Sequence, residues 1–408
     1  MLTKGAARTR SRLSSTLVTA GFTYFGLGLS VLSAPFVARE LGADGRGALA
    51  ASFVLVQLIA WTAFLGLPRT SALQRVKEGV VSFRSVFYMA GLGIFATVVT
   101  FVAAPLASGG DARVEGGIEI ASGTLALSGL ATLGSEILQL ERKFLAWNLL
   151  RSCNLSLPSV AIIVLFFLDK LSFQSAFFAT YVGTALWAVA GTIVAIVSSR
   201  KLLASRRPAW GFSLRIWFTR LFDFVGMRVD QVLLAALATT SQLGTYAVAA
   251  TCASASGALT QALGHVVFPD QAAASADAQS RNGRVFLVGI GSSIASSAAM
   301  LLVIAVFGDI LFGPTFDGLL PTAALLMVFQ LLSDQWNLVV YRDSAGMSAG
   351  QLAGSSLVGL LTLCVSLVAV NMFWDINGIS MAACMIAFGA ARLISRFASG
   401  LAHVGNPA

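Results

Sequence analysis

Long apolar stretches alternate with short polar segments along the whole chain, and this pattern indicates the class of protein. A helix of about 20 residues crosses a hydrocarbon layer about 30 Å thick, which matches the length of these stretches. No stretch shows the sustained two-residue alternation of a membrane strand, so the spans are predicted to be helices. The twelve predicted spans are residues 14–37, 48–67, 85–107, 118–140, 144–168, 175–197, 218–238, 243–268, 285–307, 319–341, 352–373 and 376–393, and the sequence leaves open whether the last is complete.

The composition agrees with a chain whose surroundings are mostly lipid. Hydrophobic residues make up 57% of the sequence and charged residues only 11%, and the mean hydropathy is +0.82. Soluble globular domains carry about 25% charged residues, so a single water-exposed core could not hide this much apolar surface. The predicted fold class is an all-α polytopic membrane protein with about twelve transmembrane helices.

The positions of lysine and arginine predict the orientation of the spans, because positively charged short loops stay on the cytoplasmic side. With the N-terminus inside, only Arg39, Arg46, Arg113 and Lys170 fall on the outer side. Most other basic residues fall in cytoplasmic segments, with a dense group between residues 200 and 220. We therefore expect a multi-pass protein of the inner (cytoplasmic) membrane with both termini in the cytoplasm.

Charge and side-chain chemistry exclude several classes of partner. The net charge is +9, but the basic residues are dispersed over short loops, so anionic membrane lipids are the expected partner and nucleic acid is not. Cys153, Cys252, Cys364 and Cys384 stand singly inside spans, and the chain has only two histidines. No metal site and no catalytic residue is predicted.

The longest predicted cytoplasmic connection, residues 198–217, divides the spans into six and six. We predict an N-terminal six-helix lobe with a cytoplasmic tail over residues 1–205 and a C-terminal six-helix lobe over residues 206–408. Span seven then enters the membrane in the same direction as span one, as in parallel repeats. A short similarity supports the repeat, because Gly47-Ala48-Leu49-Ala50-Ala51 and Gly244-Thr245-Tyr246-Ala247-Val248 each follow a short external turn.

Ionisable side chains inside the seventh span are costly to insert, by about 2.5 to 3.5 kcal/mol each, and so need an explanation. Asp223 and Asp230 share one helical face, whereas Arg228, near the middle of the bilayer, points away from it. Arg228 could hold an anionic cargo, or it could pair with a carboxylate of a neighbouring helix and fix the packing. Asp223 is expected to pair with Arg220, three residues before it.

Three other spans carry polar side chains at helical spacing. They are Asn148, Arg151 and Asn154 in the fifth span, Gln330, Asp334 and Asn337 in the tenth, and Glu136 in the fourth. Such residues face protein or water, so they line a cavity or join helices by hydrogen bonds. We expect the amides to join helices by hydrogen bonds. We expect Arg151 and Asp334 to face a cavity, because a charged side chain costs too much to insert if it only holds helices together.

Several motifs resemble a known family. They are Ala34-Pro35-Phe36-Val37-Ala38-Arg39-Glu40-Leu41-Gly42, Gly45-Arg46-Gly47, Arg228-Val229-Asp230-Gln231-Val232-Leu233-Leu234, Leu243-Gly244-Thr245-Tyr246-Ala247-Val248-Ala249 and Val267-Phe268-Pro269. With the six-plus-six layout, they resemble bacterial oligosaccharide and polysaccharide flippases of the O-antigen type. These belong to a superfamily that also contains multidrug and toxic-compound extruders. Asp334-Gln335-Trp336-Asn337 and the residues after it match this family less well.

The resemblance implies two six-helix, MATE-like lobes around a cavity that opens alternately to either side. The implied cargo is a polyprenyl-diphosphate-linked oligosaccharide, moved to the outer leaflet for polysaccharide biosynthesis, with polysaccharide assembly proteins as further partners. No cofactor is implied, and a coupling H+ or Na+ stays open. Cationic side chains, above all Arg228 and Arg151, would hold the diphosphate. The candidate cargo-binding residues are Arg228, Arg151, Asp230, Asp334, Asp223, Glu136 and Gln330.

Three other functions compete with a flippase. A cation-coupled multidrug extruder of the same superfamily would use Asp223, Asp230 and Asp334 as coupling sites, although two arginines inside spans disfavour a cationic cargo. A membrane enzyme would need a positioned acid, base or nucleophile, and the sequence shows no such motif. A scaffold that transports nothing is the remaining alternative, if every polar group in the spans is paired.

Overall fold

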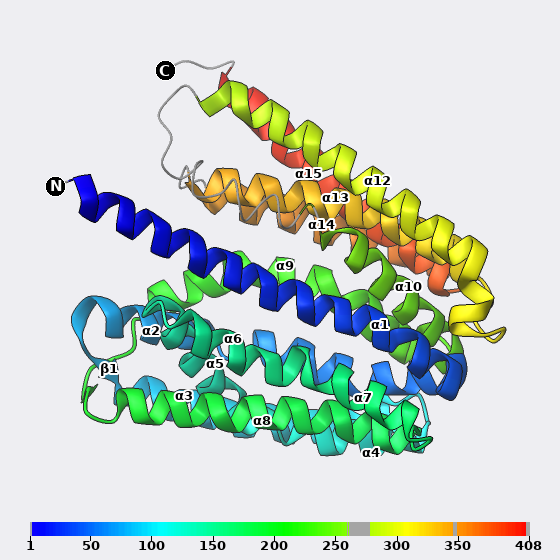
Figure 1. Ribbon diagram of the computed structural model, residues 1–408, viewed down its shortest axis with the longest axis horizontal. Helices are drawn as coiled ribbons and strands as arrows, with labels where there is room; N and C mark the ends of the chain where they lie inside the picture. Colours follow the sequence, from blue (N-terminus) through cyan, green and yellow to red (C-terminus); the bar gives the residue numbers. More distant parts are fainter. Residues whose placement is uncertain (1, 259, 261–277, 346–348, 405–408) are drawn as a thin grey trace. The chain divides into compact units, whose positions relative to one another are not determined.

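The computed structural model describes residues 2–258, 260, 278–345 and 349–404, and within these ranges the chain is almost entirely helical (Figure 1). The helices are α1 (Leu2–Thr62), α2 (Leu67–Glu78), α3 (Phe83–Ala107), α4 (Ala112–Ser122), α5 (Leu125–Leu140), α6 (Phe144–Leu155), α7 (Leu157–Phe167), α8 (Phe173–Ser199), α9 (Trp210–Leu237), α10 (Thr240–Ser256), α12 (Ala278–Phe312), α13 (Leu319–Ala345), α14 (Ala349–Phe373) and α15 (Gly378–Val404). Two short strands, β1 (Val81–Ser82) and β2 (Leu203–Ala204), pair in parallel. The predicted all-α class is confirmed.

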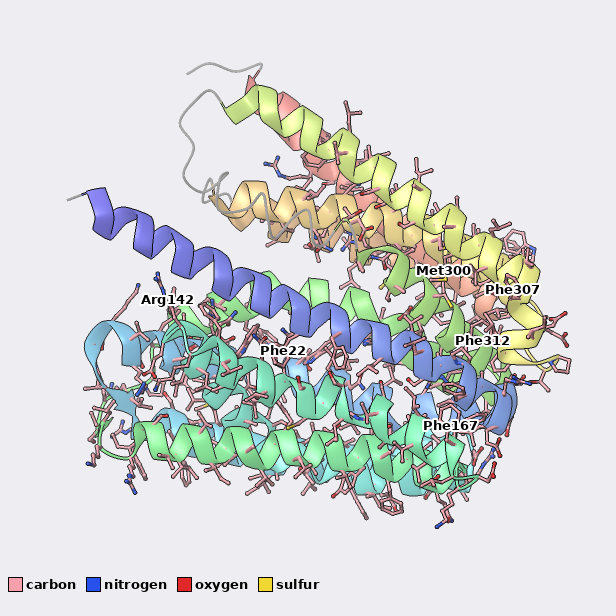
Figure 2. The ribbon with its side chains drawn as sticks, viewed as in Figure 1. Phe22, Arg142, Phe167, Met300, Phe307 and Phe312 are labelled. Atoms are coloured by element: carbon pink, nitrogen blue, oxygen red, sulfur yellow. The ribbon has the colours of Figure 1, made fainter. Side chains whose placement is uncertain are left out.

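The surfaces of the long helices are apolar and therefore require a lipid environment. In the described ranges, seven helices are long and apolar enough to cross a membrane, and the bent pair α6 and α7 makes an eighth if counted as one span. Large apolar side chains point outward: Val102 of α3 and Val365 of α14 are each 69% exposed. Phe167 of α7 and Phe307 of α12, labelled in Figure 2, are 72% and 49% exposed. Because such side chains are unfavourable in water, the polytopic membrane class is confirmed.

The first two predicted spans belong to one helix, α1, with a single break. Gly42 has a φ of 66° and a ψ of −178°, and the helix resumes directly after it. A positive φ costs little for glycine and much for other residues, so this one position can redirect the chain. The sequence predicted a short external turn before Gly47. The observed break is shorter than that, because only Gly42 departs from helical geometry.

The fourth and fifth predicted spans are each divided into two helices. The span 118–140 is interrupted near Gly123, between α4 and α5. The span 144–168 bends by 44° between α6 and α7. Pro158 lies in the first turn of α7, and a proline has no N–H for the hydrogen bond that would continue the preceding helix.

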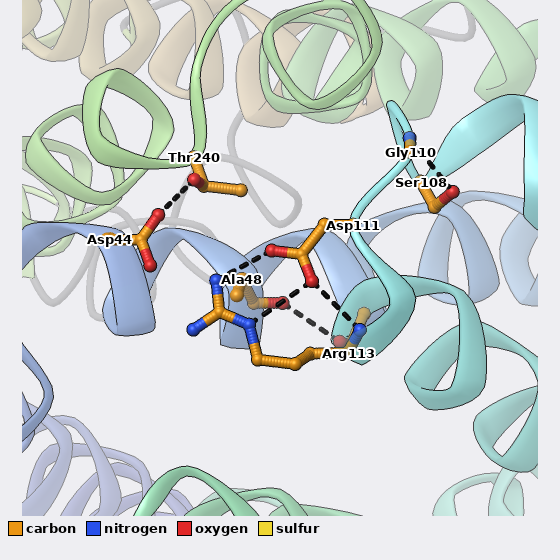
Figure 3. Close-up of polar contacts among 8 residues, drawn as sticks. Asp44, Ala48, Ser108, Gly110, Asp111, Arg113 and Thr240 are labelled. Carbon is orange, nitrogen blue, oxygen red and sulfur yellow. Dashed lines mark hydrogen bonds and ion pairs between the residues drawn. The ribbon is translucent and has the colours of Figure 1, made fainter.

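The connection between α3 and α4 is shorter than the sequence indicates. The predicted loop covers residues 108–117, but α4 begins at Ala112, because Asp111 caps it (Figure 3). Oδ1 of Asp111 accepts a hydrogen bond from the backbone N–H of Arg113 at 2.8 Å, and Oδ2 lies 2.7 Å from Nη2 of the same arginine. The hydrogen bond from the Arg113 side chain lowers the pKa of Asp111, so the capping carboxylate is ionised at neutral pH.

Met1–Glu40 and Leu55–Trp217 form the first compact unit, unit 1. Helix α5 packs against α2, α3 and α8, and α6 and α7 pack against α8. The core includes Leu67, Ala72, Met89, Leu133, Ile137 and Ala195. Helices α5 and α8 touch backbone to backbone, since a Cβ on Gly134 would lie 2.0 Å from the carbonyl oxygen of Gly191. Small residues permit this close packing without any hydrophobic effect between helices in lipid.

Leu41–Val54 and Phe218–Ala408 form the second compact unit, unit 2. Helix α13 packs against α10, α12 and α15, and α14 packs against α15. The core includes Leu363, Cys384, Met385 and Phe388, with a second cluster of Trp336, Val339 and Leu393. This repeats the plan of unit 1, with α13 in the place of α5 and α15 in the place of α8, which supports the repeat. The division into two six-helix lobes, residues 1–205 and 206–408, stays a prediction.

The predicted linker, residues 198–217, is fastened to unit 1. Strand β2 of the linker pairs with β1, and the hydroxyl of Ser82 donates to the carbonyl oxygen of Arg206 at 2.6 Å. Arg206 also forms an ion pair with Glu78 of α2. Further along, the hydroxyl of Ser213 donates to that of Thr70 at 2.8 Å. The connection, with the first residues of α9 as far as Trp217, is therefore part of unit 1.

Candidate functional site

Asp230, on α9, is held by a tyrosine of the next helix. The hydroxyl of Tyr246, on α10, donates to Oδ2 of Asp230 at 2.5 Å, and the backbone N–H of Gln231 donates to Oδ1 at 2.8 Å. Asp230 and Tyr246 are both buried. The predicted site residue Asp230 thus lies in the interior of unit 2, where it joins α9 to α10.

Arg228 precedes Asp230 by two residues and lies on a different side of α9. Its side chain is half-buried, and one of its contacts is a hydrogen bond from Nη1 to Oε1 of Gln231 at 3.3 Å. The assignment of Arg228 to cargo binding stays a prediction. The side chain of Asp223 lies outside the described residues.

A second polar group in unit 2 surrounds Asp334 of α13. Its Oδ2 accepts a hydrogen bond from the hydroxyl of Ser293 on α12, and its Oδ1 accepts one from the amide of Gln330, each at 2.8 Å. The hydroxyl of Thr260 lies 2.7 Å from that of Ser293. Asp334 is 1% exposed, so its ionised form depends on these donors rather than on water. Gln330 and Asp334, both predicted site residues, are thus brought together.

A glycine leaves room for this group, and the amide side chain beside it has no hydrogen-bond partner among the described residues. A Cβ on Gly257 would lie 2.4 Å from Nε2 of Gln330 and 2.8 Å from Oδ1 of Asp334. Next to Asp334, the buried amide of Gln335 has neither its nitrogen nor its oxygen in a hydrogen bond with any described residue. A buried amide without partners costs about 1–3 kcal/mol, so the group is not optimised for stability alone.

The polar residues of the fifth predicted span lie on α6. The guanidinium carbon of Arg151 lies 4.6 Å from the ring centroid of Trp147, and the indole N–H of Trp147 donates to the hydroxyl of Ser135 at 3.1 Å. The hydroxyl of Thr184 donates to the side-chain oxygen of Asn154 at 3.0 Å. Arg151 is thus half-buried on an aromatic ring whose position a hydrogen bond fixes.

Glu136, on α5, has a cationic partner within unit 1. It forms an ion pair with Arg69 of α2, and the same Nη1 of Arg69 lies 3.4 Å from the side-chain oxygen of Gln139. This contact joins α2 to α5. The part of Glu136 in cargo binding stays a prediction.

Arg46 is a cation that the sequence analysis left in an outer loop. It lies in the helical part of α1 after Gly42, and its side chain is half-buried, with Nε fully buried. With the described residues, this side chain makes no hydrogen bond, ion pair or ring contact. The flanking glycines of Gly45-Arg46-Gly47 are the sequence signal, since they indicate a helix surface in close contact.

The sequence and the fold both match known proteins. The model of a family of polysaccharide biosynthesis proteins matches residues 36–283, more than half of the chain. The solved structure of the lipid II flippase MurJ in an inward closed conformation is similar over 94% of this chain and 87% of that one, with a TM-score of 0.71 and 11% identity. No curated protein sequence matches the chain at a significant level.

Transporters of the MOP superfamily have the same fold. An inward-facing multidrug resistance MATE family transporter is similar over 91% of this chain and 93% of that one, with a TM-score of 0.66 and 13% identity. For a MOP superfamily transporter from Pyrococcus furiosus, the coverages are 95% and 94%, the TM-score is 0.59 and the identity is 15%. At these identities, the likeness shows the fold alone. The chain belongs to the polysaccharide biosynthesis protein family, and its fold is the one that MurJ and the MATE transporters share.

Proposed function

We propose that this protein is a flippase that moves a polyprenyl-diphosphate-linked oligosaccharide across the cytoplasmic membrane for polysaccharide biosynthesis. The observation that carries the proposal is the family match over residues 36–283. The fold supports it, because the structure of the lipid II flippase MurJ has a TM-score of 0.71 to this chain. Movement of the cargo is by alternating access between two six-helix lobes, residues 1–205 and 206–408.

The charges inside the spans fit a cargo of this chemistry. A diphosphate is a dense anion, and an arginine can donate two parallel hydrogen bonds to its oxygens. Arg228 on α9 and Arg151 on α6 are each half-buried, and the Nε donor of Arg46 has no hydrogen-bond partner among the described residues. These three side chains are the proposed contacts of the diphosphate. Asp230, Asp334, Asp223 and Gln330 stay candidate contacts of the sugar hydroxyls, whereas Glu136, which pairs with Arg69, is proposed to act through packing.

The proposed setting is the inner membrane, with both termini in the cytoplasm. Its basis is the concentration of lysine and arginine in alternate connections. The lipid tail of the cargo stays in the bilayer during transfer, while the glycan passes through the protein. Polysaccharide assembly proteins on the outer side are the proposed receivers, and the protein itself performs no covalent chemistry on the cargo.

Deletion of the gene tests this proposal in cells. The expected result is loss of the surface polysaccharide together with accumulation of the lipid-linked oligosaccharide in the inner leaflet. A plasmid copy of the wild type restores export, and a copy with Arg228→Ala, present in the membrane at the same level, does not. Unchanged export in the deletion strain would contradict the proposal.

A cation-coupled extruder of organic cations is the second candidate. Two buried carboxylates, Asp230 and Asp334, favour it, because carboxylates inside spans are the usual coupling groups. A drug-efflux assay of the same deletion strain separates the two functions. Efflux of a cationic dye that depends on this gene, and on a Na+ or H+ gradient, would favour the extruder.

A further inference from the structure

The pair of strands β1 and β2 joins the ends of two membrane-spanning helices of unit 1 (Figure 1). Strand β1 directly precedes α3, and β2 follows soon after the end of α8. Val81 pairs with Leu203, and Ser82 pairs with Ala204. Both helices are long and apolar enough to cross a membrane. The pair therefore stands where α3 and α8 leave the hydrocarbon layer, at the level of the lipid headgroups.

Aromatic side chains mark the same level. The ring of Tyr88, on α3, meets the ring of Trp210 edge to face, with centroids 5.3 Å apart. Tryptophan and tyrosine are enriched at membrane–water interfaces, because one end of each side chain is apolar and the other is polar. Phe83 and Phe87, in the first turns of α3, are large apolar side chains that stay exposed. The apolar surface for lipid acyl chains thus begins directly beside the strand pair.

Basic side chains surround the strand pair. Arg84 follows β1, Arg200 and Lys201 precede β2, and Arg207 follows β2. These four residues, here called the basic cluster, are all exposed. None of them forms an ion pair with any residue that the structure describes. Because adjacent strands lie about 4.8 Å apart, the pairing of β1 with β2 brings these positive charges together from distant parts of the sequence.

The carboxylates at this end of unit 1 are already neutralised. The glutamates of its predicted cytoplasmic segments and adjoining helix ends are Glu78, Glu136 and Glu141. Each of them forms an ion pair with an arginine that lies outside the basic cluster. The cluster therefore keeps an excess of positive charge, and an anion from outside the chain is needed to balance it.

Arg84 is the member of the cluster that needs this anion most. It lies in the first turn of α3, where the helix dipole places partial positive charge. Arg200 and Lys201, at the C-terminal end of α8, are favoured by the dipole of their own helix, so helix stability alone can account for them. It cannot account for Arg84. A phosphate beside the strand pair would be attracted by Arg84 and by the end of α3 together.

We propose that the β1–β2 pair is a binding site for an anionic phospholipid of the inner leaflet. The phosphate of the lipid contacts the basic cluster, and its acyl chains lie on the apolar surfaces of α3 and α8, which include the exposed side chains of Phe87 and Val197. A zwitterionic headgroup carries its own cation, so it cannot balance the cluster. The dispersed basic residues of the sequence predict anionic lipids in general, whereas this inference assigns one lipid to one place.

The site has a consequence for the connection between the halves of the chain. Strand β2 lies in the segment 198–217, which links the first six predicted spans to the last six. A lipid that contacts residues on both sides of β2 and on α3 fastens this segment to unit 1 and to the membrane surface. Binding of the lipid is independent of the cargo, so the inference does not rest on the proposed flippase function.

Native mass spectrometry of the purified protein in detergent tests the site. The wild type should bind dioleoylphosphatidylglycerol but not dioleoylphosphatidylcholine. R84Q/R207Q should bind the anionic lipid about 25-fold more weakly, because each lysine or arginine near an anionic headgroup contributes about fivefold. R142Q/K170Q removes the same charge from exposed positions away from the strand pair and should bind as the wild type does. Undiminished binding by R84Q/R207Q, or an equal loss in R142Q/K170Q, would overturn the proposal.

Hydrogen exchange locates the lipid and separates binding from a structural role. Dioleoylphosphatidylglycerol should slow amide exchange in residues 80–88 and 198–208 of the wild type, and R84Q/R207Q without added lipid should exchange as the wild type does. Faster exchange in the lipid-free variant would show that the two arginines hold the strand pair together, and would overturn the proposal. Slowing confined to other segments, or equal slowing by inorganic phosphate alone, would also overturn it.

Discussion

The hydroxyl of Tyr246 and the carboxylate of Asp230 are 2.5 Å apart, and both groups are buried between α9 and α10. Tyr246 follows Gly244 by two residues on α10, and a Cβ on Gly244 would lie 1.8 Å from the carbonyl oxygen of Ala43 on α1. A charged hydrogen bond in a region of low polarity is strong and directional. It therefore fixes the position of α10 relative to α9, and with it the surface that α1 meets.

Removal of this hydrogen bond should destabilise the protein. Tyr246→Phe leaves a buried carboxylate without its side-chain donor, at a cost of about 1–3 kcal/mol. The measurement is thermal unfolding of the purified protein in detergent, with Tyr181→Phe as control. The contact would be unimportant if both variants unfolded at the temperature of the wild type.

Glu136 should act through packing rather than through cargo binding. Its ion pair with Arg69 is partly exposed, so Glu136→Gln should lower the free energy of unfolding by only about 0–1 kcal/mol, and less at high salt. Transfer of the cargo should stay near the wild-type rate. A large loss of transfer with unchanged stability would instead place Glu136 in the transport path.

The cap of α4 should make stability depend on pH in acid. The side-chain hydrogen bond from Arg113 lowers the folded-state pKa of Asp111 below its ordinary value of 3.8. The stabilising effect is therefore complete above pH 3.8 and is lost as the pH falls through the lower folded value. Asp111→Asn should unfold at a lower temperature than the wild type at pH 7, and the difference should shrink at pH 3. A difference that grows in acid would contradict this assignment.

Trp147 should orient Arg151 for the cargo. A cation–π contact with a partly desolvated ring contributes about 0.5–2 kcal/mol, which corresponds to a few-fold to about thirtyfold change in an equilibrium constant. Trp147→Leu should therefore raise the cargo concentration needed for half-maximal transfer, while Trp147→Phe, which keeps a ring, should raise it less. Equal effects of the two variants would argue against the stacking.

The apolar periodicity of the sequence was sufficient to predict the class of fold and most spans. Spans such as 85–107 and 352–373 coincide closely with α3 and α14, because an uninterrupted apolar run in lipid has no alternative to a helix. The breaks were not predicted. Gly42 and Pro158 each interrupt a helix through local backbone geometry, which hydropathy does not report.

The candidate site was predictable only in its residue types. Spacing along α13 indicated that Gln330 and Asp334 share a face, and they do form a hydrogen bond. The partners from other helices, such as Ser293 and Tyr246, could not be identified, because a serine or tyrosine in an apolar span carries no signal of what it faces. Arg46 was assigned to a loop because the one-residue break at Gly42 was unknown.

Arg228 gives the most direct test of the proposed function. The measurement is transfer of a fluorescent polyprenyl-diphosphate-linked oligosaccharide across liposomes that contain the purified protein, compared with Arg228→Ala, Arg228→Lys and the exposed control Arg142→Ala (Figure 2). Wild type and Arg142→Ala should transfer the cargo, Arg228→Lys should retain part of the rate, and Arg228→Ala should fall to the rate of empty liposomes while its unfolding temperature is unchanged. Full transfer by a folded Arg228→Ala protein, or no transfer by the wild type, would contradict the account.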